Sequence, residues 1–513
     1  MNMQSGVSTM KHSKRTTVRS PWVLSGWPIY LLLLICWGQG HASENWLDQQ
    51  KSEFKRFSEG SQQQLQDYQQ QQNTEFGQWL SHEWQAFEQY RGLIRDAAPK
   101  FSTPPRIGVT PLTANRSNRN EPLDTSISLS TPLSITQPGV EDKMPEITGT
   151  VSAKAQAGEF WFYGHSLRIS TVLPSDLPKI ADQQDIRDAW LQLSNSTHQP
   201  QLQQLRATQE TLELSDWATV QMVQRYSQEM PVSHNQQTMV AWFYLSQLGY
   251  RVCVGFSGRH LFLLYATEQT LYEKPFYLVE GERYYPTSAQ VTGSMTSYPE
   301  YPAEARKPLQ MDFSKTFKQP TLRAGGQPEE TNQSGQPLKL RLSADRLSYF
   351  QSYPQIDLVH YFRAEISPEI AEAVRSYWRQ QLAQLPPVDQ VNQLLIWLHR
   401  SFDYARDQQQ FGAENYLLPE ESLYYPASDC EDRSFLLAWM VREILDLPVI
   451  GLVYPGHVAI AVGLPQNQVA VQSNKPIRYF SRDYWVADPT YFGAKLGQVM
   501  PDFVDIKPQV IAL

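Results

Sequence analysis

Three cysteines among 513 residues are too few for a fold held together by disulfide bonds. Cys36 lies in an N-terminal segment that we expect to be removed, which leaves Cys253 and Cys430. An exported protein works in an oxidising compartment, where a free thiol is easily oxidised. A thiol that is kept in such a protein therefore needs a chemical reason. Catalysis would supply that reason for one of the two.

The chain also lacks an excess of basic residues, with 44 Lys+Arg against 52 Asp+Glu. Residues 1–43 hold four of the Lys/Arg and no Asp/Glu, so without them the formal net charge changes from −8 to −12. An acidic chain without a basic stripe argues against nucleic-acid binding.

Residues 1–43 have the composition of an export signal. Lys11, Lys14, Arg15 and Arg19 precede an apolar run over 27–37, and small residues follow. This pattern predicts a signal peptide and an exported protein, periplasmic or associated with the envelope. An uncleaved N-terminal anchor is the alternative.

Residues 44–97 carry large side chains at a period of eleven, which predicts one long amphipathic helix or coiled-coil segment. The apolar seam would need a partner, supplied by self-association, by the rest of the chain or by another envelope component. The two series are Phe54, Leu65, Phe76 and Phe87, and Phe57, Tyr68, Trp79 and Tyr90.

Composition divides the remainder into four parts. Residues 98–145 are rich in Ser, Thr and Pro and predict a linker. Residues 146–300 open with a hairpin-like pattern around Gly164 and continue into helices and strands. Residues 301–365 contain strand-like stretches and predict a β-rich connecting domain, and residues 366–513 form the last domain.

The segment from Ser233 to His260 resembles the segment from Cys430 to His457 at an offset of 197 residues, so that Trp242 falls on Trp439. Both run helix, turn, strand and a strand that begins with histidine, which predicts an internal duplication. With a different offset further on, Glu280 falls on Asp488.

The first copy has serine and glutamate where the second has cysteine and aspartate. Serine in a pocket shaped for a Cys–His pair is a poor nucleophile, because its pKa is far above that of a thiol. We therefore expect Ser233, His260 and Glu280 to mark a degenerate, structural or binding-only site. An active Ser–His–Glu triad is the alternative.

Cys430 begins a strongly helical apolar run, His457 follows at the start of a predicted strand, and Asp488 precedes Pro489. This order fits a thiol nucleophile, its base and the group that orients the base. Backbone N–H groups at the helix start and Arg433 would favour the thiolate. Tyr424 and Tyr425, just before the nucleophile, are candidate donors to an oxyanion.

Asp429, Glu431 and Asp432 flank the thiol, and like charges raise the pKa of a group that must become anionic. A bound divalent cation would remove this conflict, since calcium prefers oxygen ligands. The alternative is that Asp429 and Asp432 only cap the helix.

Together, Phe402-Asp403-Tyr404, Asp429-Cys430-Glu431-Asp432, His457 and Asp488-Pro489-Thr490 resemble the transglutaminase-like superfamily over about 385–500. The acidic string around the cysteine is similar to the bacterial transglutaminase-like cysteine proteinases. The resemblance implies an α+β, papain-like C-terminal domain. It also implies calcium beside the nucleophile, with Asp429 and Glu431 as ligands.

We therefore expect an exported, cysteine-dependent acyl-transfer enzyme, a protease or amidase acting on envelope proteins or peptides. The thiol chemistry requires no cofactor, and calcium is the one ion implied. One alternative is a non-catalytic envelope scaffold with two binding modules. The other is a peptidase that acts on peptidoglycan stem peptides.

Overall fold

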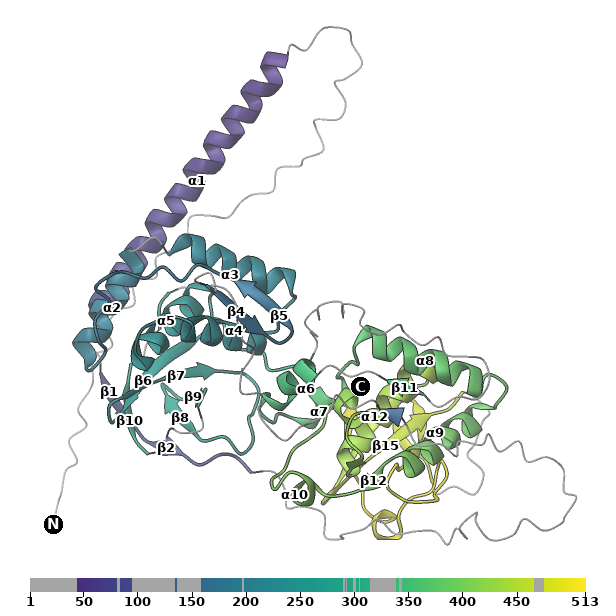
Figure 1. Ribbon diagram of the computed structural model, residues 1–513. Coiled ribbons are helices and arrows are strands. Elements are labelled where there is room, and N and C mark those ends of the chain that lie inside the picture. Colours follow the sequence, from purple (N-terminus) through teal and green to yellow (C-terminus); the bar gives the residue numbers. More distant parts are fainter. Residues whose placement is uncertain are drawn as a thin grey trace, which may run out of the picture. The chain divides into compact units, whose positions relative to one another are not determined.

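A computed structural model shows a mixed helix-and-sheet protein of the α+β class (Figure 1). It describes residues 44–80, 84–94, 134–135, 158–195, 198–288, 291, 293–298, 301–303, 305–313, 338–340, 344–465 and 475–513. The predicted signal peptide and nearly all of the predicted linker lie outside this set. The chain forms two compact bodies, residues 1–67 and 68–513. In the described part, no helix has both the length and the apolar character needed to cross a bilayer.

Helix α1 spans Glu44–Trp79. The prediction of helix as far as residue 97 is wrong beyond this point, because β1 (Gln85–Phe87) and β2 (Gln89–Tyr90) follow. The ring of Phe76 lies 5.0 Å from that of Trp190, whereas Tyr68 is 57% exposed. The last turn of α1, which carries Phe76, thus packs into the core of the second body.

The N-terminal lobe is built on a seven-stranded sheet with the order β1-β10-β6-β7-β9-β8-β2, so β1 and β2 are its two edges. Helix α5 is buried along nearly its whole length and packs on β6 and β7, because its residues are apolar on all sides. A separate hairpin of β4 and β5 confirms the strand pair predicted around Gly164. The elements are β4 (Glu159–Phe162), β5 (His165–Arg168), α2 (Gln183–Asn195), α3 (Gln199–Thr211), α4 (Asp216–Gln228), α5 (His234–Gln247), β6 (Val252–Ser257), β7 (His260–Ala266), β8 (Phe276–Val279), β9 (Glu282–Pro286) and β10 (Met295–Ser297).

The prediction of a β-rich domain over 301–365 is wrong for the residues described there. Only β11 (Lys339–Leu340) is a strand, paired with β3 (Ser134–Ile135), and α6 (Ala344–Gln351) and α7 (Leu358–Phe362) are helices. The apolar run at α7 looked like a strand, but Tyr361 and Phe362 are buried and both pack on the ring of Phe435 in α12. Contacts with the C-terminal lobe decided this local structure.

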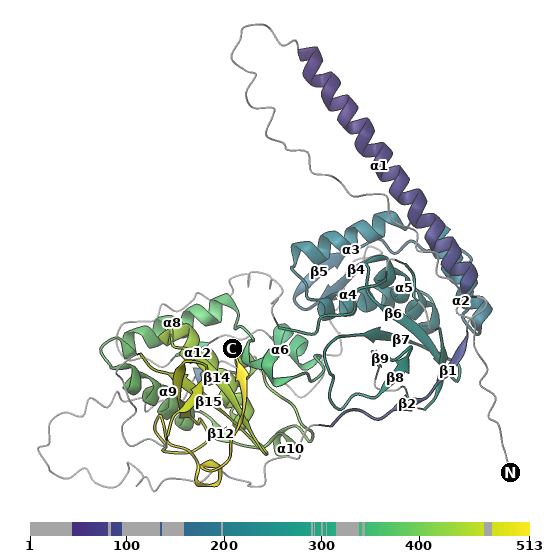
Figure 2. The ribbon, with the colours of Figure 1, turned by 180° about the vertical axis from the view of Figure 1, so that it is seen from behind.

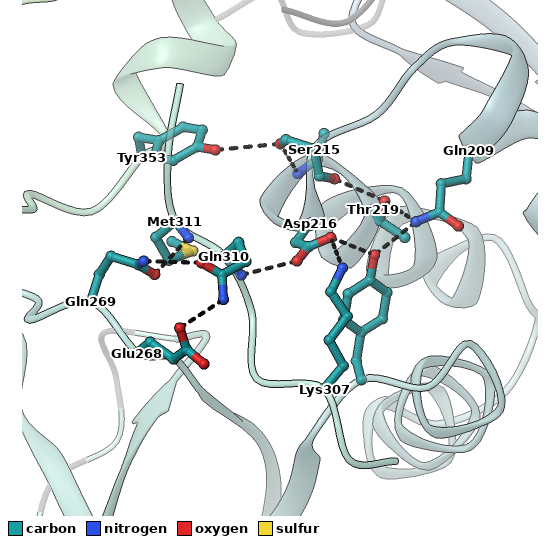
Figure 3. Close-up of polar contacts among 12 residues, drawn as sticks. Gln209, Ser215, Asp216, Thr219, Glu268, Gln269, Lys307, Gln310, Met311 and Tyr353 are labelled. Atoms are coloured by element: carbon teal, nitrogen blue, oxygen red, sulfur yellow. Dashed lines mark hydrogen bonds and ion pairs between the residues drawn. The ribbon is translucent and has the colours of Figure 1, made fainter. Parts of the chain in front are cut away.

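A polar network fastens the connecting segment to the N-terminus of α4 (Figure 3). The buried carboxylate of Asp216 accepts hydrogen bonds from Lys307 Nζ at 2.8 Å, from the Tyr250 hydroxyl at 2.9 Å and from the Gln310 backbone N–H at 2.9 Å. The Ser215 hydroxyl lies 2.7 Å from that of Tyr349 on α6. Because every bond involves a buried group, the segment is held firmly.

The C-terminal lobe packs α12 against a five-stranded sheet with the order β16-β17-β15-β14-β18 (Figure 2). Helices α7, α8, α9 and α11 cover the rest of α12, which is why its residues are buried from Cys430 to Val441. The elements are α8 (Pro368–Leu382), α9 (Pro387–Ser401), β12 (Asp403–Tyr404), α10 (Asp407–Gln410), α11 (Pro419–Ser422), β13 (Ala427–Ser428), α12 (Cys430–Leu445), β14 (Val449–Tyr454), β15 (His457–Gly463), β16 (Ile477–Tyr479), β17 (Arg482–Ala487), the 3₁₀ turn η2 (Pro501–Phe503) and β18 (Gln509–Ala512).

The two lobes share a helix followed by a hairpin in the same register. Ser257 pairs with His260 in β6–β7, and Tyr454 pairs with His457 in β14–β15, at an offset of 197 residues. Trp242 and Trp439, at the same offset, are both fully buried in their helices. The repeated sequence pattern therefore corresponds to a repeated arrangement of elements.

The predicted match between Glu280 and Asp488 is wrong. Strand β17 pairs with β15 as β9 pairs with β7, and Trp485 takes the place of Tyr285 at an offset of 200. By this register Asp488 corresponds to Ser288, whereas Glu280 is a turn residue with φ of 52° between β8 and β9. Two adjacent strands rich in aromatic residues made the alignment by sequence ambiguous.

Candidate active site

Cys430 is the first residue of α12, immediately after β13 and Asp429. Its side chain is buried, with 2% of the residue exposed, and its thiol donates a hydrogen bond to Glu431 Oε2 at 2.9 Å. The first N–H groups of a helix have no carbonyl partner within the helix. Cys430, as the first residue of α12, lies at the end of the helix that carries these donors.

His457 and Asp488 form a buried pair. His457 begins β15, Asp488 follows β17, and His457 Nε2 lies 2.8 Å from Asp488 Oδ2. Asp488 Oδ1 accepts hydrogen bonds from Thr490 N and Oγ1, both at 2.9 Å, and from Tyr491 N at 3.1 Å. Phe503 stacks on the imidazole, with ring centroids 4.9 Å apart and planes 9° apart. The ring is therefore fixed both at its edge and on its face.

Cys430 and His457 line the same cavity, which has a volume of about 550 Å³. Val458, the residue after the histidine, also lines this cavity, and its backbone lowers the pKa of the thiol without outweighing burial. One turn further along α12, Ser434 Oγ donates to the Val458 carbonyl at 3.1 Å. Packing of α12 on β15 thus brings Cys430 and His457, which the sequence separates by 27 positions, to one cavity.

Burial and the neighbouring carboxylates both oppose ionisation of the Cys430 thiol. Burial raises the pKa of Cys430 well above its usual value, and the charges of Glu431 and Asp429 raise it further. Arg433 was expected to favour the thiolate, but its guanidinium donates to the Phe402 carbonyl at 2.9 Å and to Ser428 Oγ at 3.3 Å. Burial lowers the pKa of Arg433 to about 10. The guanidinium is thus bonded to other groups, and the opposition between the carboxylates and the thiolate that the sequence predicted remains.

Asp488 has the electrostatics expected of a group that orients a histidine. Burial alone would raise the pKa of its carboxyl, but His457 and the hydrogen bonds from Thr490 outweigh it, so the pKa is lowered. The carboxylate therefore stays ionised beside the imidazole at neutral pH.

Three buried carboxylates, those of Asp407, Asp429 and Glu431, meet next to the thiol. One oxygen of each lies within 4.8 Å of the others. Burial raises the pKa of Asp407 to about 9 and that of Glu431 to about 7, and neighbouring carboxylates add to both shifts. Such a group of acids is costly in a low-dielectric site unless a positive charge compensates it.

The alternative that Asp429 and Asp432 only cap α12 is wrong. Asp429 makes no capping bond with its side chain, and its Oδ1 is buried without a hydrogen-bond partner among the described residues. Asp432 Oδ1 accepts from the Leu417 backbone N–H at 2.8 Å and so holds the preceding loop. The unpaired oxygen of Asp429, within the carboxylate group, is a ready ligand for a cation.

Sequence reasoning missed Asp407, which begins the short helix α10 and belongs to no recognisable motif. It comes close to Asp429 because β12 pairs in parallel with β13, with Tyr404 opposite Ser428. The donor set of hard carboxylate oxygens fits calcium, which takes six to eight oxygen ligands at about 2.3–2.6 Å. Asp407, Asp429 and Glu431 would hold such an ion.

Calcium is expected to raise the melting temperature of the full chain by several degrees, since a ligand at a hundred times its Kd adds about 2.7 kcal/mol of stability. Asp407→Asn is expected to remove this rise without lowering the melting temperature in EDTA, because the substitution relieves carboxylate repulsion. Asp403→Asn, an exposed neighbour, is the matched control. Differential scanning calorimetry makes the comparison, and an equal calcium-dependent rise in Asp407→Asn would contradict this cation site.

The two tyrosines predicted as oxyanion donors do not line the cavity that holds Cys430. The Tyr425 hydroxyl instead accepts a hydrogen bond from Gln351 Nε2 at 2.7 Å. The tyrosines that line the cavity are Tyr272, Tyr416 and Tyr454. Proximity in the chain did not predict them, because they come from three separate elements.

Ser233, His260 and Glu280 do not form a triad. The Ser233 side chain caps α5 in a reciprocal bond pair with Gln236, His260 is exposed at the start of β7, and Glu280 occupies a turn. The expectation of a structural copy without catalysis fits this arrangement better than an active Ser–His–Glu site. The remaining thiol, Cys253, is buried in the sheet of that lobe.

No model of a known protein family matches the chain, and a search of curated proteins finds no match.

Proposed function

We propose that the chain is a thiol-dependent acyl-transfer enzyme, a protease or amidase that acts on proteins or peptides of the cell envelope. The single observation that carries this proposal is the shared cavity of Cys430 and His457, with Asp488 bonded to the far nitrogen of the imidazole. The same arrangement supports a transglutaminase-like, papain-like identity for the C-terminal lobe. The proposed export rests on the leader at residues 1–43.

In the proposed reaction His457 takes the proton of the Cys430 thiol while the sulfur attacks a carbonyl carbon of the substrate. A C–S bond forms and the carbonyl π electrons move to oxygen, where backbone N–H groups at the start of α12 are suitably placed to donate. Collapse breaks the C–N bond, and the imidazolium returns the proton to the leaving amine. Water then cleaves the thioester by the same proton transfers.

In this proposal Nδ1 of His457 transfers the proton, which the hydrogen bond of Nε2 to Asp488 supports. Asp488 keeps the ring in that orientation and stabilises the imidazolium. Asp407, Asp429 and Glu431 would hold calcium, whose positive charge would offset the carboxylates that disfavour ionisation of the thiol.

Alkylation by iodoacetamide at neutral pH tests this proposal in the calcium-supplied full chain. Cys430 is expected to react much faster than Cys253, because Cys253 is a buried thiol with no base beside it and a pKa raised to about 12 by burial. His457→Ala is expected to slow the reaction of Cys430 at least tenfold, as the base contributes about 10²–10⁴ to proton transfer.

Peptide mapping by mass spectrometry after timed quenching reads out each thiol separately. Equal, slow labelling of Cys430 in the wild type and in His457→Ala would refute an activated nucleophile and favour a non-catalytic scaffold.

A further inference from the structure

One wall of the cavity that Cys430 lines comes from the N-terminal lobe and from the segment that follows β2. Ile94, which follows β2, and Tyr272, which precedes β8, line it together with residues of the C-terminal lobe. Ile94 is 80% exposed, although large aliphatic side chains are usually buried. An exposed isoleucine in the wall of a cavity gains stabilisation when a ligand covers it.

Tyr272 is held rigidly in this wall. Its backbone N–H donates to the Gln355 carbonyl at 2.9 Å, and its hydroxyl donates to Asp357 Oδ1 at 2.7 Å. A β-bridge pairs it with Leu93, the residue before Ile94. Tyr272 and Ile94 therefore lie on two backbone segments that are paired with each other. The surface that their side chains form is preorganised for binding.

The charges of the lining restrict what can enter. Asp357, Glu414 and Glu431 line the cavity, and its described lining contains no lysine or arginine. A substrate with several carboxylates, such as a peptidoglycan stem peptide, would meet the like charges of Asp357 and Glu414, which lie outside the proposed calcium ligand set and have no lysine or arginine beside them in the lining. The cavity volume of about 550 Å³ lies in the range that encloses ligands of a few residues.

We propose that the N-terminal lobe, which carries no catalytic triad, supplies the substrate-recognition wall of the active site. In this inference, which rests on the proposed function, Ile94 and Tyr272 contact a large apolar side chain of an extended polypeptide that is neutral or basic near the scissile bond. The occupant is a polypeptide because Ile94 and Tyr272 line the same cavity as Cys430, where the proposed reaction cleaves a peptide or amide bond. The lobe thereby acts in recognition although its own copy of the site does not act in catalysis.

Binding of short synthetic peptides to the full-length Cys430→Ala variant tests this wall without requiring turnover. The peptides differ at one scanned position, which carries Leu, Ala, Lys or Glu, and a purified muropeptide is included. We expect the Leu peptides to bind about 10-fold or more tightly than the Glu peptides, since an apolar subsite discriminates by roughly 10–200-fold. Adding Ile94→Asp is expected to remove this preference. Val172→Asp, also on an exposed aliphatic residue of the lobe but outside the cavity, is expected to leave it intact.

Fluorescence polarisation gives each affinity. Unchanged affinities in the Ile94→Asp background, tightest binding of the muropeptide, or no binding of any peptide would overturn the recognition wall. If the Leu peptides bind as expected but the wild type never cleaves them, the wall is supported and the proposed hydrolysis is contradicted.

Discussion

Replacing Cys430 by alanine is expected to lower kcat/KM for peptide hydrolysis by on the order of 10⁴-fold or more, the largest effect of any single substitution in this chain. The alanine has no atom that can form the thioester. The serine variant is expected to be almost as inactive, because its hydroxyl keeps the position but ionises far less readily than a thiol. Cleavage of a peptide that the Cys430→Ala variant binds, followed by chromatography, measures the loss.

Cys253→Ala is the matched control for this loss. Cys253 is equally buried, but its neighbour is Ser297 rather than a histidine. The control is therefore expected to keep nearly wild-type kcat/KM and to show at most a modest change in melting temperature. Full activity of Cys430→Ala with an intact fold would place the chemistry elsewhere.

Asp488→Asn is expected to lower kcat by roughly 10²–10⁴-fold while changing KM little, because an amide favours the wrong tautomer of His457 and stabilises the imidazolium less. The substitution also turns one of the two side-chain oxygens into a donor. Oδ1 accepts three hydrogen bonds and Oδ2 faces Nε2 of His457, so neither orientation of an amide fits. Steady-state kinetics on the same peptide separate kcat from KM, and Asp505→Asn, an exposed acid nearby in the chain, is the control.

The pH dependence of stability gives Asp488→Asn a second readout. The pKa of Asp488 is lowered from 3.8 in the folded chain, so its ionised form contributes stability above that value. The stability difference between wild type and Asp488→Asn is expected to be constant above about pH 4 and to shrink as the pH falls below the unfolded pKa. A difference that grows on acidification, measured by urea unfolding, would contradict the ionised pair with His457.

The three residues of the proposed triad were chosen from the sequence because each follows a strong local signal. Cys430 begins an apolar helical run, His457 follows a Pro-Gly turn between two apolar runs, and Asp488 precedes a proline. The structure has α12, β15 and the end of β17 at these positions. The matching register of the two hairpins was also visible as a repeat in the sequence. Each lobe buries a helix and two strands, so corresponding positions must be apolar in both lobes.

The failures concern residues whose surroundings come from distant parts of the chain. The run at 358–362 is helical because Phe435 of α12 covers it, and Asp407 joins the carboxylates because β12 lies beside β13. Glu280 was misassigned because alternation alone cannot decide which of two neighbouring strands pairs with β7. Tyr424 and Tyr425 precede the nucleophile in the chain but lie outside its cavity.

The helix that begins at Cys430, the strand that begins at His457 and the sulfur, imidazole and carboxylate of the proposed triad follow from the amino acids alone, since short-range periodicity and turn residues specify them. Only the tertiary structure decided the ionisation of the thiol, the third carboxylate beside it and the entry of Ile94 and Tyr272 into the cavity wall. The physical reason is that burial, charge proximity and shared cavities depend on distances between segments, and chain order does not fix those distances.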